Sequence, residues 1–311
     1  MLKSEDKNRI AALIAAFRLF VYGLLAQTEE KAKDISTLAD SKRRAGDWAG
    51  LQDLGIQLAS ALTKISKIMG AIRRMDLQTE AIDAARQAFE KTGNYCLTLK
   101  IARTILDMGE PSKMPCLAYG LPAAACQVGA ILRKKAGSIC SLCYACKGNY
   151  NYIEVMACNY RRLAAIMDLD LWIEAFSMVL QAYLDGKIKG KGKHNDPRYF
   201  RFHDTGDLQS AQHLEAIVEI AKRFPQVSFW VPTKERKIVS NYLKSFGNFP
   251  SNLVVRVSMP MIGQDPSDFH GLPIACVDSS KAKPCRMING ECGSCRDCWD
   301  PKVRAVSYGK H

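Results

Sequence analysis

The chain has 311 residues, of which 48% are hydrophobic and 24% charged, and it carries 12 cysteines and a formal net charge of +13. This length can bury one large core or two smaller ones. The first residues are charged and lack an apolar run before a small-residue cleavage site, which excludes a secretory leader and predicts a cytoplasmic protein. In that compartment, cysteines spaced as CxxC indicate metal binding rather than disulfides.

The positive charge is unevenly distributed along the chain. Residues 1–92 contain 15 Lys and Arg against 12 Asp and Glu, so +10 of the +13 falls on residues 93–311. Part of this excess lies in the run GKIKGKGK at 186–193. A basic surface of this kind is typical of proteins that bind a polyanion, so we expect DNA or RNA as a partner. The alternative is a set of lysines that are only solvated.

Residues 1–93 are predicted to form an all-α helical bundle. Ser4 can cap the first helix, and Gly93 after Lys91 is a typical helix stop. In between, apolar residues recur at the three- and four-residue steps of a helix with one apolar face. They are Leu51, Leu54, Leu58, Leu62, Ile65 and Ile68. Three or four antiparallel helices would bury these faces, and we expect a protein partner to dock on this bundle.

The stretch from Ile10 to Ala26 resembles a membrane span in composition. It is 17 residues long and contains Arg18, whereas a span needs about 20 apolar residues. We therefore predict a buried bundle helix and no membrane association. The alternative is an interfacial or oligomerising helix.

Residues 94–311 are predicted to form an α/β domain. Apolar strand-like segments (RYFRFHD, QVSFWVPT and NLVVRVSMP) alternate with helical ones (AQHLEAIVEIAKRF and ERKIVSNYLKSF). Short connections in this order predict parallel strands with right-handed crossovers, arranged as a partial β/α barrel.

Polar residues follow these strands, and the carboxyl ends of parallel strands carry the active groups in such folds. The first strand ends in the turn 203–207 (HDTGD), the second in Thr233-Lys234-Glu235 and the third in Ser258-Met259. We take His203, Asp204 and Asp207 as candidate catalytic residues. The alternative is a buried core histidine with aspartates that cap the next helix.

A cysteine cluster lies near the end of the chain, in PCRMINGECGSCRDCWD. It contains Cys285, Cys292, Cys295 and Cys298. Thiolates bind zinc or iron–sulfur clusters, and the triple at two-residue spacing resembles the ferredoxin pattern for a 4Fe–4S cluster. Gly293 lets the backbone turn close to sulfur. We predict a 4Fe–4S cluster here, with zinc as the alternative.

Several motifs together resemble the phage gene product 88 family. They are KMPCLAYGLPAAAC, GSICSLCYACKGNY, RFHDTGDLQS, NLVVRVSMP and the C-terminal cysteine run, within about residues 98–308. The resemblance implies a bacteriophage protein that acts in the cytoplasm of the infected host. It also implies that Cys126, Cys140 and Cys143 belong to one family pattern with the turn 203–207 and the C-terminal cysteines.

Three cysteines that bind a cubane leave one iron open to a substrate or cofactor. Such a loop before a strand is similar to radical S-adenosylmethionine enzymes, in which a Gly-Gly-Glu-like turn contacts the cofactor. By that resemblance Thr205 and Gly206 of the DTGD sequence, Tyr144 after the last cysteine and Ser258 would bind S-adenosylmethionine. The spacing departs from the usual CxxxCxxC, since thirteen residues separate Cys126 from Cys140.

The sequence thus predicts an iron–sulfur protein with one or two clusters, a redox or radical-type enzyme that acts on or near nucleic acid. The alternative is a nucleic-acid-binding or interaction protein that zinc or a cluster stabilises without catalysis. The roles of Cys116, Cys146, Cys158 and Cys276 are left open.

Overall fold

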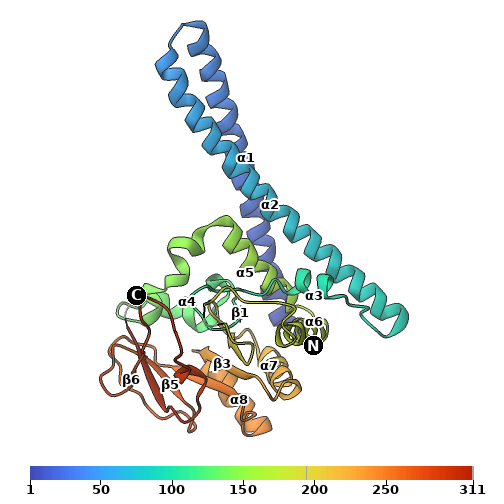
Figure 1. Cartoon of the computed structure of the whole chain (residues 1–311), viewed down its shortest axis with the longest axis vertical. Helices are drawn as coiled ribbons and strands as arrows, with labels where there is room; N and C mark the ends of the chain where they lie inside the picture. Colours follow the sequence, from blue (N-terminus) through green and yellow to red (C-terminus); the bar gives the residue numbers. More distant parts are fainter. Residues whose placement is uncertain (194, 310–311) are drawn as a thin grey trace.

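The computed structural model describes residues 1–193 and 195–309 and combines a long helical arm with an α/β body (Figure 1). The helices are α1 (Ser4–Arg44), α2 (Trp48–Thr92), α3 (Leu99–Leu106), α4 (Gln127–Arg133), α5 (Ile153–Ala165), α6 (Leu169–Leu184), α7 (Ala211–Arg223) and α8 (Arg236–Phe246). The strands are β1 (Ala118–Tyr119), β2 (Tyr199–Phe202), β3 (Ser228–Thr233), β4 (Leu253–Ser258), β5 (Ile274–Val277), β6 (Lys283–Pro284) and β7 (Ala305–Tyr308).

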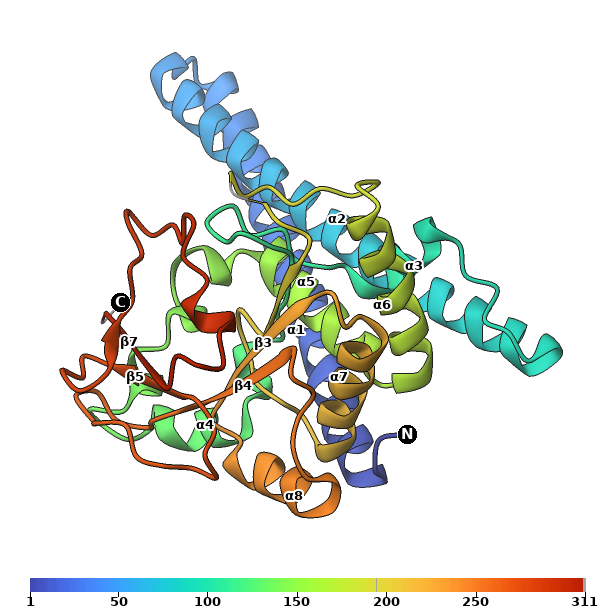
Figure 2. The same ribbon diagram turned by 60° about the horizontal axis from the view of Figure 1, so that its bottom comes forward.

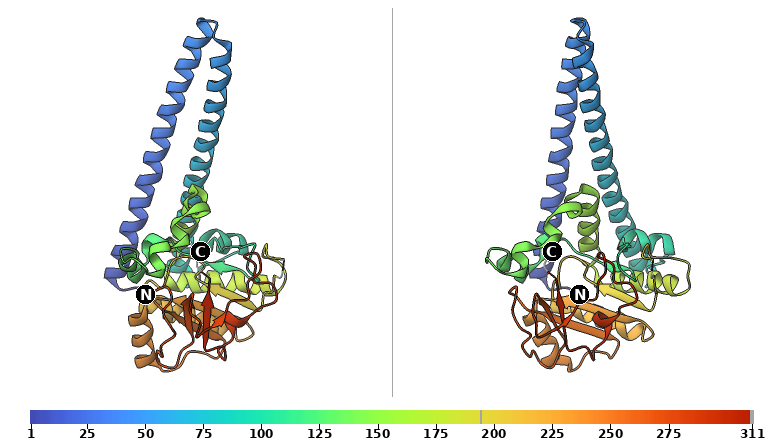
Figure 3. Two further views of the ribbon diagram at one scale, coloured as in Figure 1. Left: turned by 90° about the vertical axis from the view of Figure 1, so that its left-hand side faces the viewer. Right: turned by 60° about the vertical axis from the view of Figure 1, so that its left-hand side comes forward.

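The arm is an antiparallel hairpin of α1 and α2 that projects from the body (Figure 3). The chain reverses at Gly46, whose φ of +71° suits glycine, and the Asp47 side chain caps α2 by accepting from Gly50 N at 2.9 Å. The prediction of three or four helices was wrong, because α2 continues without a break from Trp48 to Thr92 and residues 1–93 form two helices.

The base of the arm packs against the body. Ile10 and Ile82 belong to the main hydrophobic core, and higher up Phe17 stacks on Tyr160 of α5 with ring centroids 3.9 Å apart. By length and composition α1 could cross a membrane, and only 17% of its most apolar 18-residue window is buried. The prediction of a buried helix over residues 10–26 was therefore wrong: within this stretch Ile10, Phe17 and Val21 are buried, whereas Leu19 is 74% exposed, because a two-helix hairpin covers only one face of each helix.

All neighbouring strands in the seven-stranded sheet are parallel, in the order β1-β2-β3-β4-β5-β7-β6. Every residue of β4 is buried, and β3 pairs with it from Phe229↔Leu253 to Thr233↔Val257. Helices α6, α7 and α8 pack in sequence beside these strands (Figure 2). The prediction of parallel strands alternating with helices is confirmed for β2, β3 and β4, whose carboxyl ends meet at one edge of the sheet.

Candidate functional site

The turn 203–207 follows β2 and is closely packed against the segment that follows β1. Gly206 has a φ of +78°, and a Cβ placed there would lie 2.6 Å from Leu121 Cβ and 2.7 Å from its carbonyl oxygen. Thr205 Oγ1 donates to that carbonyl at 2.8 Å, and Leu121 N donates to Thr205 O at 2.8 Å. Only glycine fits at 206, and Thr205 and Gly206 therefore hold the turn in place.

Asp207 connects the ends of β2 and β3. Its Oδ1 accepts from Thr233 Oγ1 at 2.5 Å and from Leu208 N at 2.8 Å, and its Oδ2 accepts from Lys234 N at 2.9 Å. The side chain is buried, so these three donors satisfy a carboxylate that would otherwise be costly to bury. This bonding makes Asp207 a brace of the site.

Asp204 is placed differently, because one of its carboxylate oxygens faces the interior without a hydrogen-bond donor. Its Oδ1 is buried and has no hydrogen-bond partner among the residues that the structure describes, and a Cβ on Gly120 would lie 2.3 Å from it. Its backbone oxygen accepts from the Tyr144 hydroxyl. A buried acceptor without a donor calls for an explanation, and a hydrogen bond from a bound ligand is one explanation.

His203 lies fully inside the protein, 2% exposed, with Nδ1 2.8 Å from the Tyr119 carbonyl oxygen. A carbonyl only accepts, so Nδ1 carries the proton, and Nε2, which has no partner in the described part of the chain, is an acceptor. Burial lowers the pKa of His203. The imidazole of His213 lies 5.3 Å away, centroid to centroid. His203 is therefore a neutral base enclosed by the core.

The structure brings Cys126 and Cys140 together next to this turn. Cys126 immediately precedes α4, and Gly129 lies in the first turn of α4, close to both thiols. A Cβ on Gly129 would lie 3.6 Å from Cys126 Sγ and 3.7 Å from Cys140 Sγ. Cys143 ends the short 3-10 segment that contains Cys140. Both thiols therefore lie close to Gly129, although Cys126 and Cys140 are fourteen positions apart in the sequence.

The electrostatics of these thiols place Asp207 and Lys234 beside them. Burial raises the pKa of Cys126, and the nearby charges of Asp207 and Cys143 raise it further, while Lys234 acts in the opposite direction. Burial likewise raises the pKa of Cys140, which Lys234 again opposes. Without a metal these thiols are neutral, so metal binding would have to release their protons.

Cys146 lies next to Cys143, and its pKa is raised first by burial and then by the charge of Cys143. Across residues 1–193 and 195–309, no three His, Cys, Asp or Glu side chains are arranged as the ligands of a metal ion. The thiols fit a soft metal in chemistry. Their sulfurs would have to draw closer together to ligate one.

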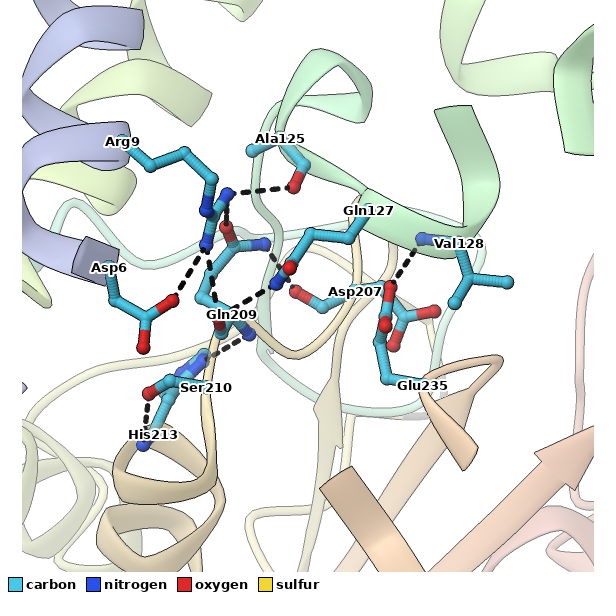
Figure 4. Close-up of polar contacts among 10 residues, drawn as sticks. All are labelled: Asp6, Arg9, Ala125, Gln127, Val128, Asp207, Gln209, Ser210, His213 and Glu235. Carbon is cyan, nitrogen blue, oxygen red and sulfur yellow. Dashed lines mark hydrogen bonds and ion pairs between the residues drawn. The ribbon is translucent and has the colours of Figure 1, made fainter. Parts of the chain in front are cut away.

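Helix α4 is anchored by Glu235, which follows β3. Its Oε1 accepts from Val128 N at 2.9 Å (Figure 4), and Val128 is two positions after Cys126 in the sequence. Burial raises the pKa of Glu235, and Asp207 adds to the rise.

Ser258, which ends β4, is 9% exposed, and in the described part of the chain its side chain makes no hydrogen bond to the turn 203–207.

The C-terminal cysteines occupy the loop between β6 and β7. Cys285 follows β6 and donates its N–H to Ser307 O of β7 at 2.8 Å. Cys292 N donates to Lys113 O at 3.2 Å, and Cys295 N donates to Cys292 O at 3.0 Å. Burial raises the pKa of Cys292, and the nearby charges of Cys285 and Cys295 raise it further. The four thiols thus share one neighbourhood.

Two buried side chains hold this loop against the sheet. Trp299, 4% exposed, donates Nε1–H to Phe200 O at 2.9 Å. Arg256 of β4, fully buried, donates to the carbonyls of Val303 at 3.0 Å and Asp297 at 3.2 Å. Cys298 Sγ lies 3.1 Å from the Tyr308 hydroxyl, and burial raises its pKa to about 11.

A family model described as gene product 88 matches residues 87–269. The chain belongs to the gene product 88 family. Neither a search of the curated proteins nor one of the solved structures found a match.

The gene product 88 match contains Cys126, Cys140, Cys143 and the turn 203–207. It ends before Cys285, so the C-terminal cysteines lie beyond the matched residues. Most of the arm lies before the matched residues. Yet Arg9 of α1 donates to Ala125 O at 3.4 Å and to Gln209 O at 3.0 Å (Figure 4). The arm of this gene product 88 protein is therefore bonded to both sides of the candidate site.

Sequence reasoning missed several residues that the structure places at the two cysteine clusters. Lys234 and Glu235 lie one and two positions after β3, at the strand end where the sequence already indicated polar groups. Met114 gave no signal, yet its Sδ lies 3.8 Å from Cys292 Sγ. Cys116 is buried, which raises its pKa, and the nearby charge of Cys292 raises the pKa further.

Proposed function

We propose that this protein is an iron–sulfur enzyme of redox or radical type, with its reactive centre at the carboxyl ends of the parallel strands. Cys126, Cys140 and Cys143 would hold a 4Fe–4S cluster with one iron open to a ligand. The observation that carries the proposal is the meeting of Cys126 and Cys140 over Gly129, beside Asp207 and Lys234. On this view the sheet is part of a β/α barrel.

A second centre would be held by Cys285, Cys292, Cys295 and Cys298. With four thiolates it would have no open position, and its role would be electron transfer or bracing of the C-terminal loop. Zinc is the alternative metal here. The packing of Trp299 supports a centre shielded from water.

The open iron would bind its ligand next to Asp204. The unpartnered Oδ1 of Asp204 can accept a hydrogen bond from an amino or hydroxyl group, whereas the oxygens of Asp207 are already occupied. His203, neutral and buried, could accept a hydrogen bond from the ligand through Nε2. S-adenosylmethionine, whose amino group is such a donor, is the first ligand to test.

The test is anaerobic incubation of the reduced protein with S-adenosylmethionine, followed by mass spectrometry for methionine and 5′-deoxyadenosine. Radical chemistry predicts both products from the wild type and neither from C126S/C140S. C96S, which alters an exposed cysteine outside both clusters, is the matched control. If the iron-loaded protein forms neither product, radical chemistry with S-adenosylmethionine is ruled out, and redox chemistry without this cofactor remains as the proposal.

Nucleic acid is the proposed macromolecular partner, on the basis of the net charge of +13. In the lysine run 186–193, Lys187 pairs with Asp185 at 3.1 Å, Lys191 with Glu110 at 3.4 Å and Lys193 with Glu291 at 3.8 Å. Phosphates would have to compete with these ion pairs, so the run should contribute fewer than four phosphate contacts.

Fluorescence anisotropy with labelled duplex and single-stranded DNA and with RNA, over a range of salt concentrations, tests this partner. Replacing the four lysines of the run by glutamine should weaken binding equally for unrelated sequences and flatten the salt dependence. Absence of binding at low salt would remove nucleic acid from the proposal and leave the metal centres untouched.

A further inference from the structure

The outer face of α2 carries a second helical stripe that no part of residues 1–193 and 195–309 covers. The stripe that faces α1 is buried and has seven-residue spacing: Leu54, Ala61, Ile68 and Met75. A second set of residues has the same seven-residue spacing but begins one position later in each repeat, and these residues are exposed: Trp48, Gly55, Leu62 and Met69. Gln52, Ala59, Ser66 and Arg73 alternate with them and are also exposed.

These eight residues, the outer stripe, follow the alternating three- and four-residue steps of a helix–helix contact. The apolar members are well exposed, with Trp48 at 70%, Leu62 at 53% and Met69 at 55%. A Cβ on Gly55 would meet no atom within 4 Å. A helix with two adjacent stripes is suited to a bundle of more than two helices.

The outer stripe is complementary to itself when two copies run antiparallel. With the two-fold axis between residues 60 and 61, Leu62 lies against Ala59 of the second copy and Ser66 against Gly55. The large Leu62 thus meets a small residue, Met69 meets the flexible Gln52, and the two small residues Ser66 and Gly55 allow the helices to approach closely. At each end Arg73 lies over Trp48 of the second copy, as in a cation–π contact. In a parallel pair, by contrast, Arg73 would face another Arg73.

We infer that two copies of this chain associate through the outer stripe of α2, so that the two hairpins form an antiparallel four-helix bundle. The contact would extend over residues 48–73, about 40 Å of helix. The symmetry is that of an isologous dimer, in which the same patch serves both copies.

A membrane is the other surface that could cover exposed apolar residues on this arm. Only α1 among the described helices is apolar enough to span one. The outer stripe lies on α2, where Lys64, Lys67 and Arg74 are exposed beside it. Charges at this density favour a protein partner over the hydrocarbon interior.

Sedimentation equilibrium of the full-length chain over a dilution series tests the inference. The wild type should sediment at the mass of two chains, and L62E at the mass of one with an unchanged helical circular dichroism spectrum. L19E is the matched control, because Leu19 is 74% exposed on α1 and lies outside the stripe. It should remain dimeric.

A charge exchange tests the antiparallel register. R73E should weaken the dimer, and W48K/R73E should restore it, because the introduced lysine of each copy would then meet the introduced glutamate of the other. A monomeric wild type would overturn the inference. So would dissociation by L19E but not L62E, or co-flotation of the protein with anionic phospholipid vesicles in place of dimerisation.

Discussion

Arg9 of α1 donates hydrogen bonds from both terminal nitrogens to Gln209, at 3.0 Å to its side-chain oxygen and 3.0 Å to its backbone oxygen. Gln209 in turn donates Nε2–H to Asp207 O at 2.7 Å. The two residues are 200 positions apart. A movement of the arm would therefore reach the turn that braces the candidate site.

Replacing Arg9 by Ala should destabilise the protein by about 1–3 kcal/mol, because Gln209 and Ala125 would lose charge-assisted donors in a partly buried position. The unfolding midpoint in urea measures the loss. R43A is the control, since Arg43 pairs with Asp40 on the exposed part of the arm and should matter by less than about 1 kcal/mol. Equal effects of the two variants would contradict the bonding described above.

The two aspartates of the turn should separate structure from ligand binding. D207N replaces one acceptor of a buried carboxylate by a donor, and should lower the free energy of unfolding by about 1–3 kcal/mol. D204N should destabilise the protein less than D207N does, since Asp204 Oδ1 accepts no hydrogen bond within the described residues and only the attraction of its charge to Arg162 and Arg201 would be lost. Calorimetric binding of S-adenosylmethionine to the iron-loaded protein should be weakened in D204N. The reverse pattern would exchange the roles of the two residues.

Stability should fall in mild acid because two buried histidines resist protonation. Burial lowers the pKa of His203 and of His213 from the ordinary 6.5. The unfolded chain therefore takes up protons below pH 6.5 that the folded chain does not. Above about pH 6.5 the contribution is constant, and below it each histidine should remove up to about 1.4 kcal/mol per pH unit.

Urea unfolding between pH 8 and pH 5 measures this slope. H213Q should flatten it, whereas H270Q, at an exposed histidine, should leave it unchanged. A slope that persists in H213Q and in H203Q would assign the acid sensitivity to other groups.

The parallel order of β2, β3 and β4 was predictable because each strand is apolar, several residues long and followed by polar residues. β1 and β6 have two residues each and leave no periodic signal. The unbroken α2 could not be deduced, because its apolar stripe changes partner from α1 to the body without a change in helix propensity. The meeting of Cys126 with Cys140 depends on tertiary packing, since spacing alone does not place α4 beside the next loop.

Replacing Cys295 by Ser should remove the C-terminal centre and spare the first. Metal content should fall to about half, and the unfolding temperature should drop because ligation and folding of the loop are coupled. Cys295 lies 3.7 Å from Arg286 Nη2, so C295S also frees this guanidinium. R286Q is the control for this loss of the Arg286–Cys295 contact, since it removes the contact but should keep the full metal content. Unchanged metal in C295S would mean that these four cysteines do not form one centre.

The most direct test of the central claim is the iron, acid-labile sulfide and zinc content of the anaerobically purified protein. Two cubane clusters predict about eight iron and eight sulfide per chain, with broad absorbance near 400 nm. C126S/C140S should retain about half of each. A colourless protein with stoichiometric zinc and no sulfide, in wild type and variant alike, would contradict the account.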